Sequence, residues 1–490
     1  MTILTKALLD ALNISQNYPE LASEYRSFVT DSRRSGPDTI FVALAGVSAN
    51  GWDYLEQVAA NGCSLVLLPQ EIEVSIPKGV VALRVEDIRN RVAGLIRMFY
   101  GPAPKHIVAV TGTNGKSSTC FYLAQLAQAC GLRSAMIGTF GLGPLDQLQA
   151  ATHTTPDFLS LHQYLSEFGQ QGVELVAFEA SSHALDQGRL EGVEVATGIF
   201  TNLTRDHLDY HGSMEAYGAA KQKLFSMPNI ELGVGCVDDE HCEFMLSPLR
   251  GSQTCTVGFA ADADLQITNV TPHPSGFQVA FVKDGESYDV ALPLLGRFNV
   301  INAMLALAAL WPLVSEPQQL LQHVSKLKGA PGRMQVVTRA NAPLVVVDYA
   351  HTPDALQVAL AAVREHVQGR LICIFGCGGD RDRGKRTLMM AAALAGADRV
   401  VLTSDNPRTE DPQQIFADAL HGVSRQMAQV LTIPDRRQAI AQVIAQADGH
   451  DVVLIAGKGH ETYQEINGQR FHFDDREQAE EALAQYVSHA

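Results

Sequence analysis

Short apolar runs separated by helical stretches constrain the fold of this chain more than any other feature. Runs such as 107–110, 371–376 and 451–457 consist almost only of apolar residues, whereas a strand with one face in water alternates apolar and polar residues. Strands that are buried on both faces belong to parallel sheets with helices on each side. The sequence therefore predicts an α/β protein with its functional residues at the carboxyl ends of the strands.

Two segments rich in proline and glycine predict linkers between domains. The segments 100–106 (YGPAPKH) and 328–335 (KGAPGRMQ) each precede a strand-like run, and such clusters mark breaks between periodic segments. A length of 490 residues is enough for about three domains. Between about 253 and 295 the pattern changes to a period of two with turn sequences, which predicts β-hairpins. The predicted domains are residues 1–100, 101–333 and 334–490.

Composition limits the location and the partners of the protein. The net charge of −16 argues against binding to nucleic acid, because such binding needs a basic surface. The eight cysteines are scattered without a Cys-x-x-Cys pair, which favours buried reduced thiols over disulfides or a zinc site. The start of the chain predicts an amphipathic helix rather than a signal peptide, and the longest apolar stretch, 301–314, is too short to span a bilayer. We expect a cytoplasmic monomer without membrane insertion.

The strongest local motif is AVTGTNGKSST at 109–119, between a predicted strand and a predicted helix. Its glycines permit a tight loop with inward backbone N–H groups, Lys116 can reach the β- and γ-phosphates, and Ser117 can bind Mg²⁺. Val110 occupies the first glycine position of the common phosphate-binding pattern. The same letters could form an ordinary turn, but the strand–loop–helix context favours a nucleoside triphosphate site. The candidate ATP contacts here are Gly112, Thr113, Asn114, Gly115, Lys116, Ser117 and Ser118.

Six further motifs follow in order along the chain. They are FEASSH (178–183), TNLTRDHLDYHG (201–212), GRFNVINAMLA (296–306), VDYAHTPDAL (347–356), GCGGDRDRGKR (376–386) and AGKGHE (456–461). Together with the Gly-Thr-Asn-Gly-Lys-Ser loop they resemble the Mur ligase family, over nearly the whole chain. The resemblance implies three α/β domains: an N-terminal domain for a UDP-linked substrate, a central P-loop-type ATPase domain with a parallel sheet and β-hairpins, and a Rossmann-like C-terminal domain.

The resemblance implies a magnesium site in the central domain. Glu179 would bind Mg²⁺ together with Ser117 and His207. Lys221 stands at the spacing where relatives carry a lysine carbamylated by CO₂ (N6-carboxylysine), and a carbamate suits an oxygen-seeking Mg²⁺. With Lys116, the residues Glu179, His207 and Lys221 would form the catalytic set. The same resemblance implies contacts with ATP by three residues outside the loop: Asn302, which would meet adenine, Asp348 and His351.

Each of these residues also has a simpler interpretation when it is taken alone. Glu179 could cap a helix, His207 or His211 could be an ordinary loop histidine, and Lys221 could lie on a helix surface. The charged stretch 380–383 could be a solvated turn. The glycines at 376–379 do not form a dinucleotide fingerprint, because Arg381 stands where the third glycine is required.

The segment SDNPRTEDP at 404–412 indicates the amino acid that is added. Its Asp-Asn-Pro-Arg pattern resembles that of the family members that add meso-2,6-diaminopimelate, which is lysine with an additional carboxylate. Arg408 offers two parallel N–H groups to that carboxylate, whereas L-lysine would leave the guanidinium unpaired. Pro407 would fix the turn that presents the arginine. By resemblance the pocket consists of Arg381, Asp405, Asn406, Pro407, Arg408, Gly457 and Glu461.

The second substrate implied by the resemblance is UDP-MurNAc-L-Ala-D-Glu. Its UDP end would meet the segments 30–34 and 45–51 of the first domain, and its muramyl end would meet segments that follow in the central domain. The residues assigned to it are Thr30, Ser32, Val47, Ser48, Ala49, His153, Thr154, Thr155, Ser181, Gln187 and Arg189.

The resemblance therefore implies an ATP-dependent ligase of peptidoglycan precursor synthesis. ATP would convert the D-glutamate side-chain carboxylate of the precursor to an acyl phosphate, and diaminopimelate would then form the amide, with ADP and phosphate as products. Two alternatives keep the family and change the acceptor: a lysine-adding ligase and a ligase similar to folylpolyglutamate synthase. A P-loop kinase or GTPase would explain the loop around Lys116 but not Asp405–Arg408. A non-catalytic binding module is disfavoured because the phosphate and metal residues are all present.

Overall fold

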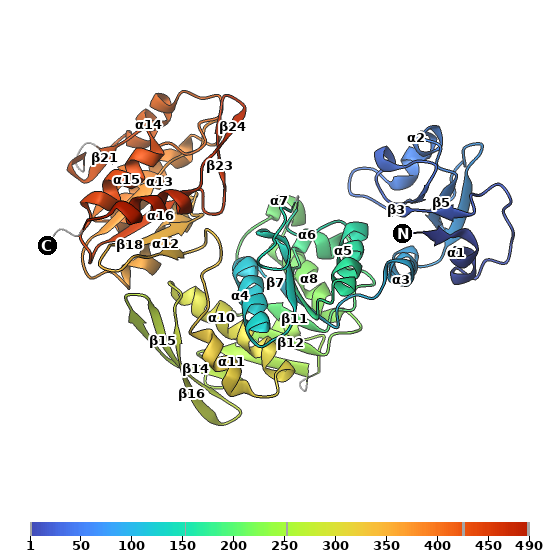
Figure 1. The fold of residues 1–490 in the computed structure, drawn as a ribbon, viewed down its shortest axis with the longest axis horizontal. Helices are drawn as coiled ribbons and strands as arrows, with labels where there is room; N and C mark the ends of the chain where they lie inside the picture. Colours follow the sequence, from blue (N-terminus) through green and yellow to red (C-terminus); the bar gives the residue numbers. More distant parts are fainter. Residues whose placement is uncertain (1, 152, 251–252, 424–426, 488–490) are drawn as a thin grey trace. The chain divides into compact units, whose positions relative to one another are not determined.

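The computed structural model describes residues 2–151, 153–250, 253–423 and 427–487 (Figure 1). The chain forms two compact units, Met1–Lys116 with Ala127–Cys255, and Ser117–Leu126 with Thr256–Ala490. The division into three domains with boundaries near residues 100 and 333 stays a prediction. No helix within the described ranges is long and apolar enough to cross a membrane. All eight cysteines carry free thiols, and all but the half-buried Cys130 are buried.

The first unit begins with a small sheet whose four strands are all parallel, in the order β3-β4-β5-β6. The strands are β3 (Ser27–Val29), β4 (Thr39–Val42), β5 (Leu65–Pro69) and β6 (Val81–Val85). Along β5, Leu65 and Leu67 join an apolar cluster on one face of the sheet, while Val66 and Leu68 join another on the opposite face. This apolar run is therefore a strand buried on both faces, as the sequence predicts.

The start of the chain differs from the single helix that its pattern predicts. β1 (Ile3–Leu4) pairs antiparallel with β2 (Glu24–Tyr25), and helix α1 (Thr5–Ala11) is correspondingly short. Pairing with a later segment, which the local pattern does not show, takes the first residues into a strand. The other helical elements of this region are η1 (Ser32–Arg34), η2 (Gly51–Tyr54), α2 (Leu55–Ala60) and α3 (Ile88–Tyr100).

The larger sheet of the first unit has the strand order β12-β11-β7-β10-β8-β9. Its strands are β7 (His106–Thr111), β8 (Ser134–Gly138), β9 (Gly141–Gly143), β10 (Leu175–Glu179), β11 (Thr197–Phe200) and β12 (Leu232–Cys236). Neighbouring strands in this order pair in parallel, except that β8 and β9 are antiparallel. Because β7 lies between β10 and β11, the segments that follow these three strands meet at one edge of the sheet.

Helices connect these strands, as the alternating pattern predicts. They are α4 (Lys116–Ala129), α5 (Phe158–Gln170), α6 (Ser182–Asp186), α7 (Leu208–His211), α8 (Met214–Gln222), η3 (Lys223–Ser226) and α9 (Cys242–Leu246). Helix α4 begins directly after the glycine-rich loop, so the predicted strand–loop–helix arrangement is confirmed.

The second unit contains the hairpins that the period of two predicts. β14 (Leu265–His273), β15 (Gly276–Lys283) and β16 (Glu286–Leu292) are successive antiparallel neighbours. Fully buried and partly exposed residues alternate along β15, so one of its faces is more covered than the other. The other elements of this part are β13 (Thr254–Gly258), α10 (Arg297–Leu310), η5 (Trp311–Leu313) and α11 (Pro317–Val324).

The second unit ends with a six-stranded sheet in the order β17-β18-β22-β19-β20-β21, parallel except for β17. The strands are β17 (Gln335–Val337), β18 (Leu344–Asp348), β19 (Leu371–Phe375), β20 (Arg399–Leu402), β21 (Val430–Thr432) and β22 (Val452–Ala456). Apolar clusters cover both faces, one with α12, α13 and α14 and the other with α15 and α16. The helices are α12 (Pro353–Arg364), α13 (Gly384–Gly396), α14 (Pro412–Leu420), η6 (Met427–Gln429), α15 (Arg436–Gln446) and α16 (Asp475–Gln485). A separate hairpin, β23 (Tyr463–Ile466) with β24 (Gln469–His472), follows β22 (Figure 1).

Candidate active site

The loop after β7 has the tight conformation that its glycines predict. Gly112 and Gly115 have φ angles of +143° and +86°, and a Cβ atom on Gly112 would lie 1.9 Å from the hydroxyl oxygen of Thr201. Only glycine fits such a position. The Lys116 ammonium donates to the carbonyl oxygens of Gly112 and Thr113, each at 2.8 Å. To bind a phosphate, this lysine exchanges those carbonyls for phosphate oxygens.

The segment after β11 supports the same loop. The backbone N–H of Asn114 donates to the side-chain oxygen of Asn202 at 3.0 Å, and the hydroxyl of Thr201 donates to the carbonyl of Asn114 at 2.6 Å. These bonds fix the loop from outside, so its conformation does not depend on a ligand. Ser117 and Ser118 lie in the first turn of α4, where helix N–H groups without intrahelical partners favour an anion.

Glu179 ends β10 and is 1% exposed. Its carboxylate accepts a hydrogen bond of 2.6 Å from the backbone N–H of Thr139, in the loop after β8. The interpretation of Glu179 as a helix cap is wrong, because Ser181 caps α6 by accepting from the N–H of Ala184. The structure therefore holds a buried carboxylate at the edge of the sheet where the phosphate loop lies.

Lys221 is buried, with 1% exposure, so the interpretation as a helix-surface lysine is wrong. Its ammonium donates to the carbonyl of Gly112 at 2.7 Å and lies 4.4 Å from the ring centre of Tyr217. Burial, with a smaller contribution from the charge of Lys116, lowers the pKa of Lys221 from 10.5 to about 6. Most of the Lys221 side chains therefore carry a neutral amine at pH 7, which is the form that can attack CO₂.

His207 precedes α7 and is one of a group of aromatic side chains. Its backbone has a φ angle of +51°, and its ring centre lies 4.9 Å from that of His183 and 6.1 Å from that of Tyr217. The second histidine of this motif, His211, lies 3.0 Å from the hydroxyl of Ser182. Within the described residues, no group of three or more histidine, cysteine or acidic side chains is placed to hold a metal. A magnesium site here would therefore need donors of other kinds, such as a serine or a modified lysine.

A cavity of about 990 Å³ in the first unit gathers most residues assigned to the UDP-linked substrate. Arg189 donates to the side-chain oxygen of Gln187 at 2.6 and 2.9 Å, and to the carbonyl of Thr155 at 3.0 Å. Burial lowers the pKa of Arg189, although nearby acidic groups oppose the shift. Of the predicted residues, the cavity is lined by Thr30, Ser32, Val47, Ala49, His153, Gln187 and Arg189.

The other predicted residues of this set are not among those that line the cavity. Ser48 is exposed on the neighbouring loop, and Thr154 bonds the hydroxyl of Thr139 at 3.3 Å. Thr155 and Ser181 bond each other through their hydroxyls at 3.1 Å. The sequence also did not single out Arg89, which lines the cavity. An arginine within an ordinary helical stretch gives no local signal of such a role.

The predicted ATP contacts of the second unit lie in two places. Asn302 is buried on α10, and its amide donates to the side-chain oxygen of Asn299 at 3.3 Å. That oxygen also accepts from the hydroxyl of Tyr122 on α4 at 3.0 Å. Asp348 ends β18, and its carboxylate accepts from the backbone N–H groups of Met334 and Ala350 at 2.7 and 2.8 Å. Burial raises the pKa of Asp348.

His351 is exposed three residues after Asp348. Its Nδ1 atom lies 2.9 Å from the carbonyl of Tyr349. This side chain is therefore accessible to a ligand, whereas the carboxylate of Asp348 already holds two backbone groups of its own loop. The assignment of both residues to ATP stays a prediction.

The residues predicted for the amino-acid pocket come together at the carboxyl ends of β19, β20 and β22. Asn406 donates to the carboxylate of Glu461 at 3.0 Å. Gly457 has a φ angle of +118°, and a Cβ atom there would lie 2.9 Å from the carboxylate of Asp405. A Cβ atom on Gly378 would lie within 3.0 Å of the Arg408 guanidinium and 3.8 Å of the Arg381 side chain, so these two arginines flank the same glycine.

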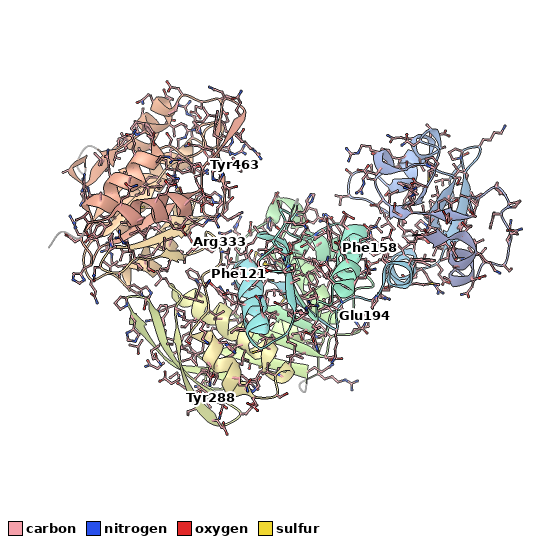
Figure 2. The ribbon with its side chains drawn as sticks, in the orientation of Figure 1. Phe121, Phe158, Glu194, Tyr288, Arg333 and Tyr463 are labelled. Atoms are coloured by element: carbon pink, nitrogen blue, oxygen red, sulfur yellow. The ribbon has the colours of Figure 1, made fainter. Side chains whose placement is uncertain are left out.

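Arg408 is held from three sides in an unusual conformation. Its φ angle is +53°, a value that residues other than glycine rarely adopt. Its backbone N–H donates to Glu465 at 3.0 Å, its carbonyl accepts from Asn467 at 2.6 Å, and its guanidinium donates to the carbonyl of Gly379 at 2.8 Å. The hairpin β23–β24 therefore continues onto the loop that carries Arg408. Tyr463, labelled in Figure 2, begins that hairpin.

Buried cations of this region were not assigned a role from the sequence, and Lys458 and Arg386 are examples. Lys458 and Arg386 are both 0% exposed. Arg386 donates to the carboxylate of Glu410 at 2.6 and 2.7 Å, to that of Asp418 at 2.8 Å and to the carbonyl of Gly378 at 3.3 Å. The hydrogen bonds from Arg386 lower the pKa of Glu410 to about 2. Both residues lie inside the motifs 376–386 and 456–461. Charged residues are usually exposed, however, and nothing in the neighbouring sequence shows that these two are buried.

Comparisons with known proteins give relatives for the whole chain. A family model for the Mur ligase middle domain matches residues 110–310, and one for the Mur ligase glutamate ligase domain matches residues 332–459. The UDP-N-acetylmuramoyl-L-alanyl-D-glutamate–2,6-diaminopimelate ligase of Xanthomonas oryzae pv. oryzae (strain MAFF 311018) is 43% identical over 485 residues, which are 96% of this chain and 97% of that one. The ligase of the same name from Coxiella burnetii (strain RSA 493 / Nine Mile phase I) is 41% identical over 97% of this chain and 98% of its own.

A solved structure of a ligase with the same name supports the fold as well as the sequence relationship. It superposes with a TM-score of 0.77 at 40% identity and covers 99% of both chains. The predicted α/β fold class is thereby confirmed. The curated relatives are 41% and 43% identical over nearly the full length, and both family models match Mur ligase domains. This chain therefore belongs to the Mur ligase family.

Proposed function

We propose that this chain is an ATP-dependent ligase that joins meso-2,6-diaminopimelate to UDP-MurNAc-L-Ala-D-Glu, with release of ADP and phosphate, in peptidoglycan precursor synthesis. The observation that carries the proposal is the pocket in which Arg408 and Arg381 flank Gly378 beside the carboxylates of Asp405 and Glu461. An amino-acid end with both a carboxylate and an ammonium group complements this pair of arginines and pair of acids. The relatives named for this reaction are 41% and 43% identical over nearly the whole chain.

The phosphate loop supplies the activating step. The γ-phosphoryl group of ATP passes to the D-glutamate side-chain carboxylate, and Lys116 compensates the negative charge on the transferred group. The neutral amine of diaminopimelate attacks the carbonyl carbon of the acyl phosphate and forms the C–N bond. The C–O bond to phosphate breaks, phosphate leaves with the bonding electrons and takes up the proton that the amine loses, and an amide remains. The strong bonds of Lys116 to two loop carbonyls at 2.8 Å keep its ammonium inside the loop before ATP arrives.

The residues that would hold Mg²⁺ are Ser117, Glu179, His207 and Lys221. Glu179 fits this role because it offers a buried carboxylate beside the phosphate loop, and Mg²⁺ prefers oxygen donors. The neutral Lys221 amine fits because attack on CO₂, with loss of one proton, gives an oxygen-rich carbamate. When bound, Mg²⁺ would neutralise charge on the ATP phosphates.

The large cavity of the first unit is proposed to take UDP-MurNAc-L-Ala-D-Glu. Its volume of about 990 Å³ matches a large ligand. Its lining includes the guanidinium groups of Arg33, Arg89 and Arg189, which would bind a diphosphate, beside the carboxylates of Asp31, Asp157, Asp186 and Glu191. The monomeric state and the cytoplasmic location expected from the sequence stay predictions.

Phosphate release tests the proposed function directly. The purified protein receives ATP, Mg²⁺ and UDP-MurNAc-L-Ala-D-Glu, and either meso-diaminopimelate or L-lysine. We expect release with L-lysine to be at least about 10³-fold slower than release with diaminopimelate, and a product whose mass is that of the precursor plus one diaminopimelate residue. Release with L-lysine alone would keep the ligase mechanism and refute the acceptor. Release with neither would refute the proposed substrates and lead to a test of folate with glutamate.

A further inference from the structure

Lys458 is a buried cation directly after β22 for which the proposed chemistry has no role so far. It is 0% exposed. Its Nζ atom lies 3.2 Å from the side-chain oxygen of Asn406, 3.3 Å from a carboxylate oxygen of Glu461 and 3.8 Å from one of Asp405. A buried ammonium is costly unless acidic and polar partners surround it. This position is therefore built around a positive charge in contact with Asn406 and Glu461, which are residues of the predicted amino-acid pocket.

The contact with Asn406 fixes the orientation of that amide. The side-chain oxygen of Asn406 accepts from Lys458 and also from the backbone N–H of Glu465 at 2.9 Å. Its side-chain nitrogen therefore points the other way and donates to Glu461 at 3.0 Å. A flipped amide would place its NH₂ group against two donors, which is unfavourable. Lys458 thus helps to orient Asn406 so that its side-chain NH₂ group faces the carboxylate of Glu461.

Lys458 also changes the charge balance of the pocket. Near Lys458 the pocket contains the carboxylates of Asp405 and Glu461, and beside Gly378 it contains the guanidinium group of Arg408. Lys458 adds one positive charge to this set. The distal end of diaminopimelate carries a carboxylate and an ammonium, whereas the matching end of L-lysine carries an ammonium alone. An additional buried cation attracts the first of these ends and repels the second.

We propose that Lys458 is a specificity-determining residue, which favours an acceptor with a distal carboxylate and rejects one whose distal end is only cationic. The proposal rests on the proposed function of the pocket. Discrimination then has two sources: Lys458 repels the distal ammonium of L-lysine, and Arg408 attracts the distal carboxylate of diaminopimelate. Both elements are needed for high specificity, because attraction alone leaves the competitor free to bind weakly.

The variant Lys458→Met tests the proposal, because methionine keeps an unbranched stem and removes the charge and the donor. The values of kcat and KM are measured with diaminopimelate and with L-lysine, and the KM for ATP is measured as well. We expect the ratio of kcat/KM for diaminopimelate over L-lysine to fall by roughly 10-fold to 100-fold. A rise in kcat/KM for L-lysine should account for most of this change, while the KM for ATP stays within about 2-fold of the wild-type value. Lys326→Met, which removes an exposed lysine of the same unit, is the matched control and should leave the ratio unchanged.

The outcomes separate this proposal from the proposed function. A wild-type enzyme that releases no phosphate with diaminopimelate refutes the function itself. An active wild type and a Lys458→Met variant that loses activity equally with both acceptors refute the role in specificity, because a general structural defect would do the same. The variant Lys458→Gln keeps a donor to Asn406 without the charge, and should show the same fall in the ratio if charge is the cause. Failure of both variants to fold, seen as loss of the cooperative thermal transition, would overturn the proposal, because the residue would then serve the fold.

Discussion

The substitution Lys221→Met is expected to make the protein more stable while it removes the ligase activity. Lys221 is 1% exposed, and burial lowers its pKa from 10.5 to about 6. In the unfolded chain the same amine titrates near its ordinary value, so between pH 6 and 10.5 the unfolded state binds a proton that the native state lacks. This difference opposes folding most at low pH, and its cost disappears as the pH rises through 10.5. Methionine carries no such cost at any pH.

The magnitude follows from the two pKa values. At about 1.4 kcal/mol per unit, the cost at pH 7 is about 5 kcal/mol, and at pH 9 it is about 2 kcal/mol. The lost hydrogen bond to the carbonyl of Gly112 offsets about 1 kcal/mol of the gain. The variant should therefore gain about 4 kcal/mol in the free energy of unfolding at pH 7, and about 1 kcal/mol at pH 9.

Equilibrium unfolding in urea at pH 7, 8 and 9 checks this expectation. The buffers are freed of CO₂ so that the amine of the wild type stays unmodified. Lys223→Met is the matched control, because Lys223 lies two residues further on, is half-exposed and pairs with Asp186 at 2.7 Å. Its removal should change the stability by less than about 1 kcal/mol at each pH. A gain for Lys221→Met that is absent, or that does not shrink as the pH rises, would refute the reasoning.

Three further substitutions test the phosphate loop, the predicted amino-acid pocket and the buried ion pairs of Arg386. Lys116→Ala should lower kcat by at least about 10³-fold in the phosphate-release assay and leave the circular dichroism spectrum unchanged; near-normal turnover would remove this lysine from the phosphate site. Arg408→Ala should lower the preference for diaminopimelate over L-lysine by about 10³-fold or more, and unchanged selectivity would contradict its assignment. Arg386→Met removes the buried partner of the carboxylates of Glu410 and Asp418 and should lower the free energy of unfolding in urea at pH 7. Because the pKa of Glu410 is lowered to about 2, this cost should persist above pH 4.5 and vanish as the pH falls toward 2, and a cost that is independent of pH would refute the pairing.

Strands buried on both faces could be predicted closely from the sequence. The predicted runs 371–376 and 451–457 agree to within one residue with β19 and β22, because continuous apolar residues between polar flanks leave little choice of boundary. The first residues of the chain were predicted less well, since β1 forms only by pairing with β2. Such pairing depends on a segment outside any local window.

The candidate site shows the same contrast between motif and burial. The glycines of the phosphate loop were predictable, because a close approach such as that of Gly112 to Thr201 requires glycine and leaves a visible motif. Lys221 was assigned through family resemblance, since its sequence neighbours look like those of a surface helix. Lys458 and Arg386 were not assigned at all, although both are 0% exposed. A lysine or arginine has the same letter whether it is buried or solvated, and only the tertiary contacts decide.

The pairing of β23 with the loop around Arg408 has a consequence for attempts to exchange acceptors between ligases. The backbone of Arg408 bonds Glu465 and Asn467, and the side-chain amide of Gln464 donates to the carbonyl of Asp405 at 2.6 Å. A chimaera that takes only residues 404–412 from another ligase would lose the matching hydrogen bonds between this loop and residues 464–467. The proposed acceptor pocket therefore depends on two separate segments, and we expect that the loop and the hairpin at 463–472 have to be exchanged together.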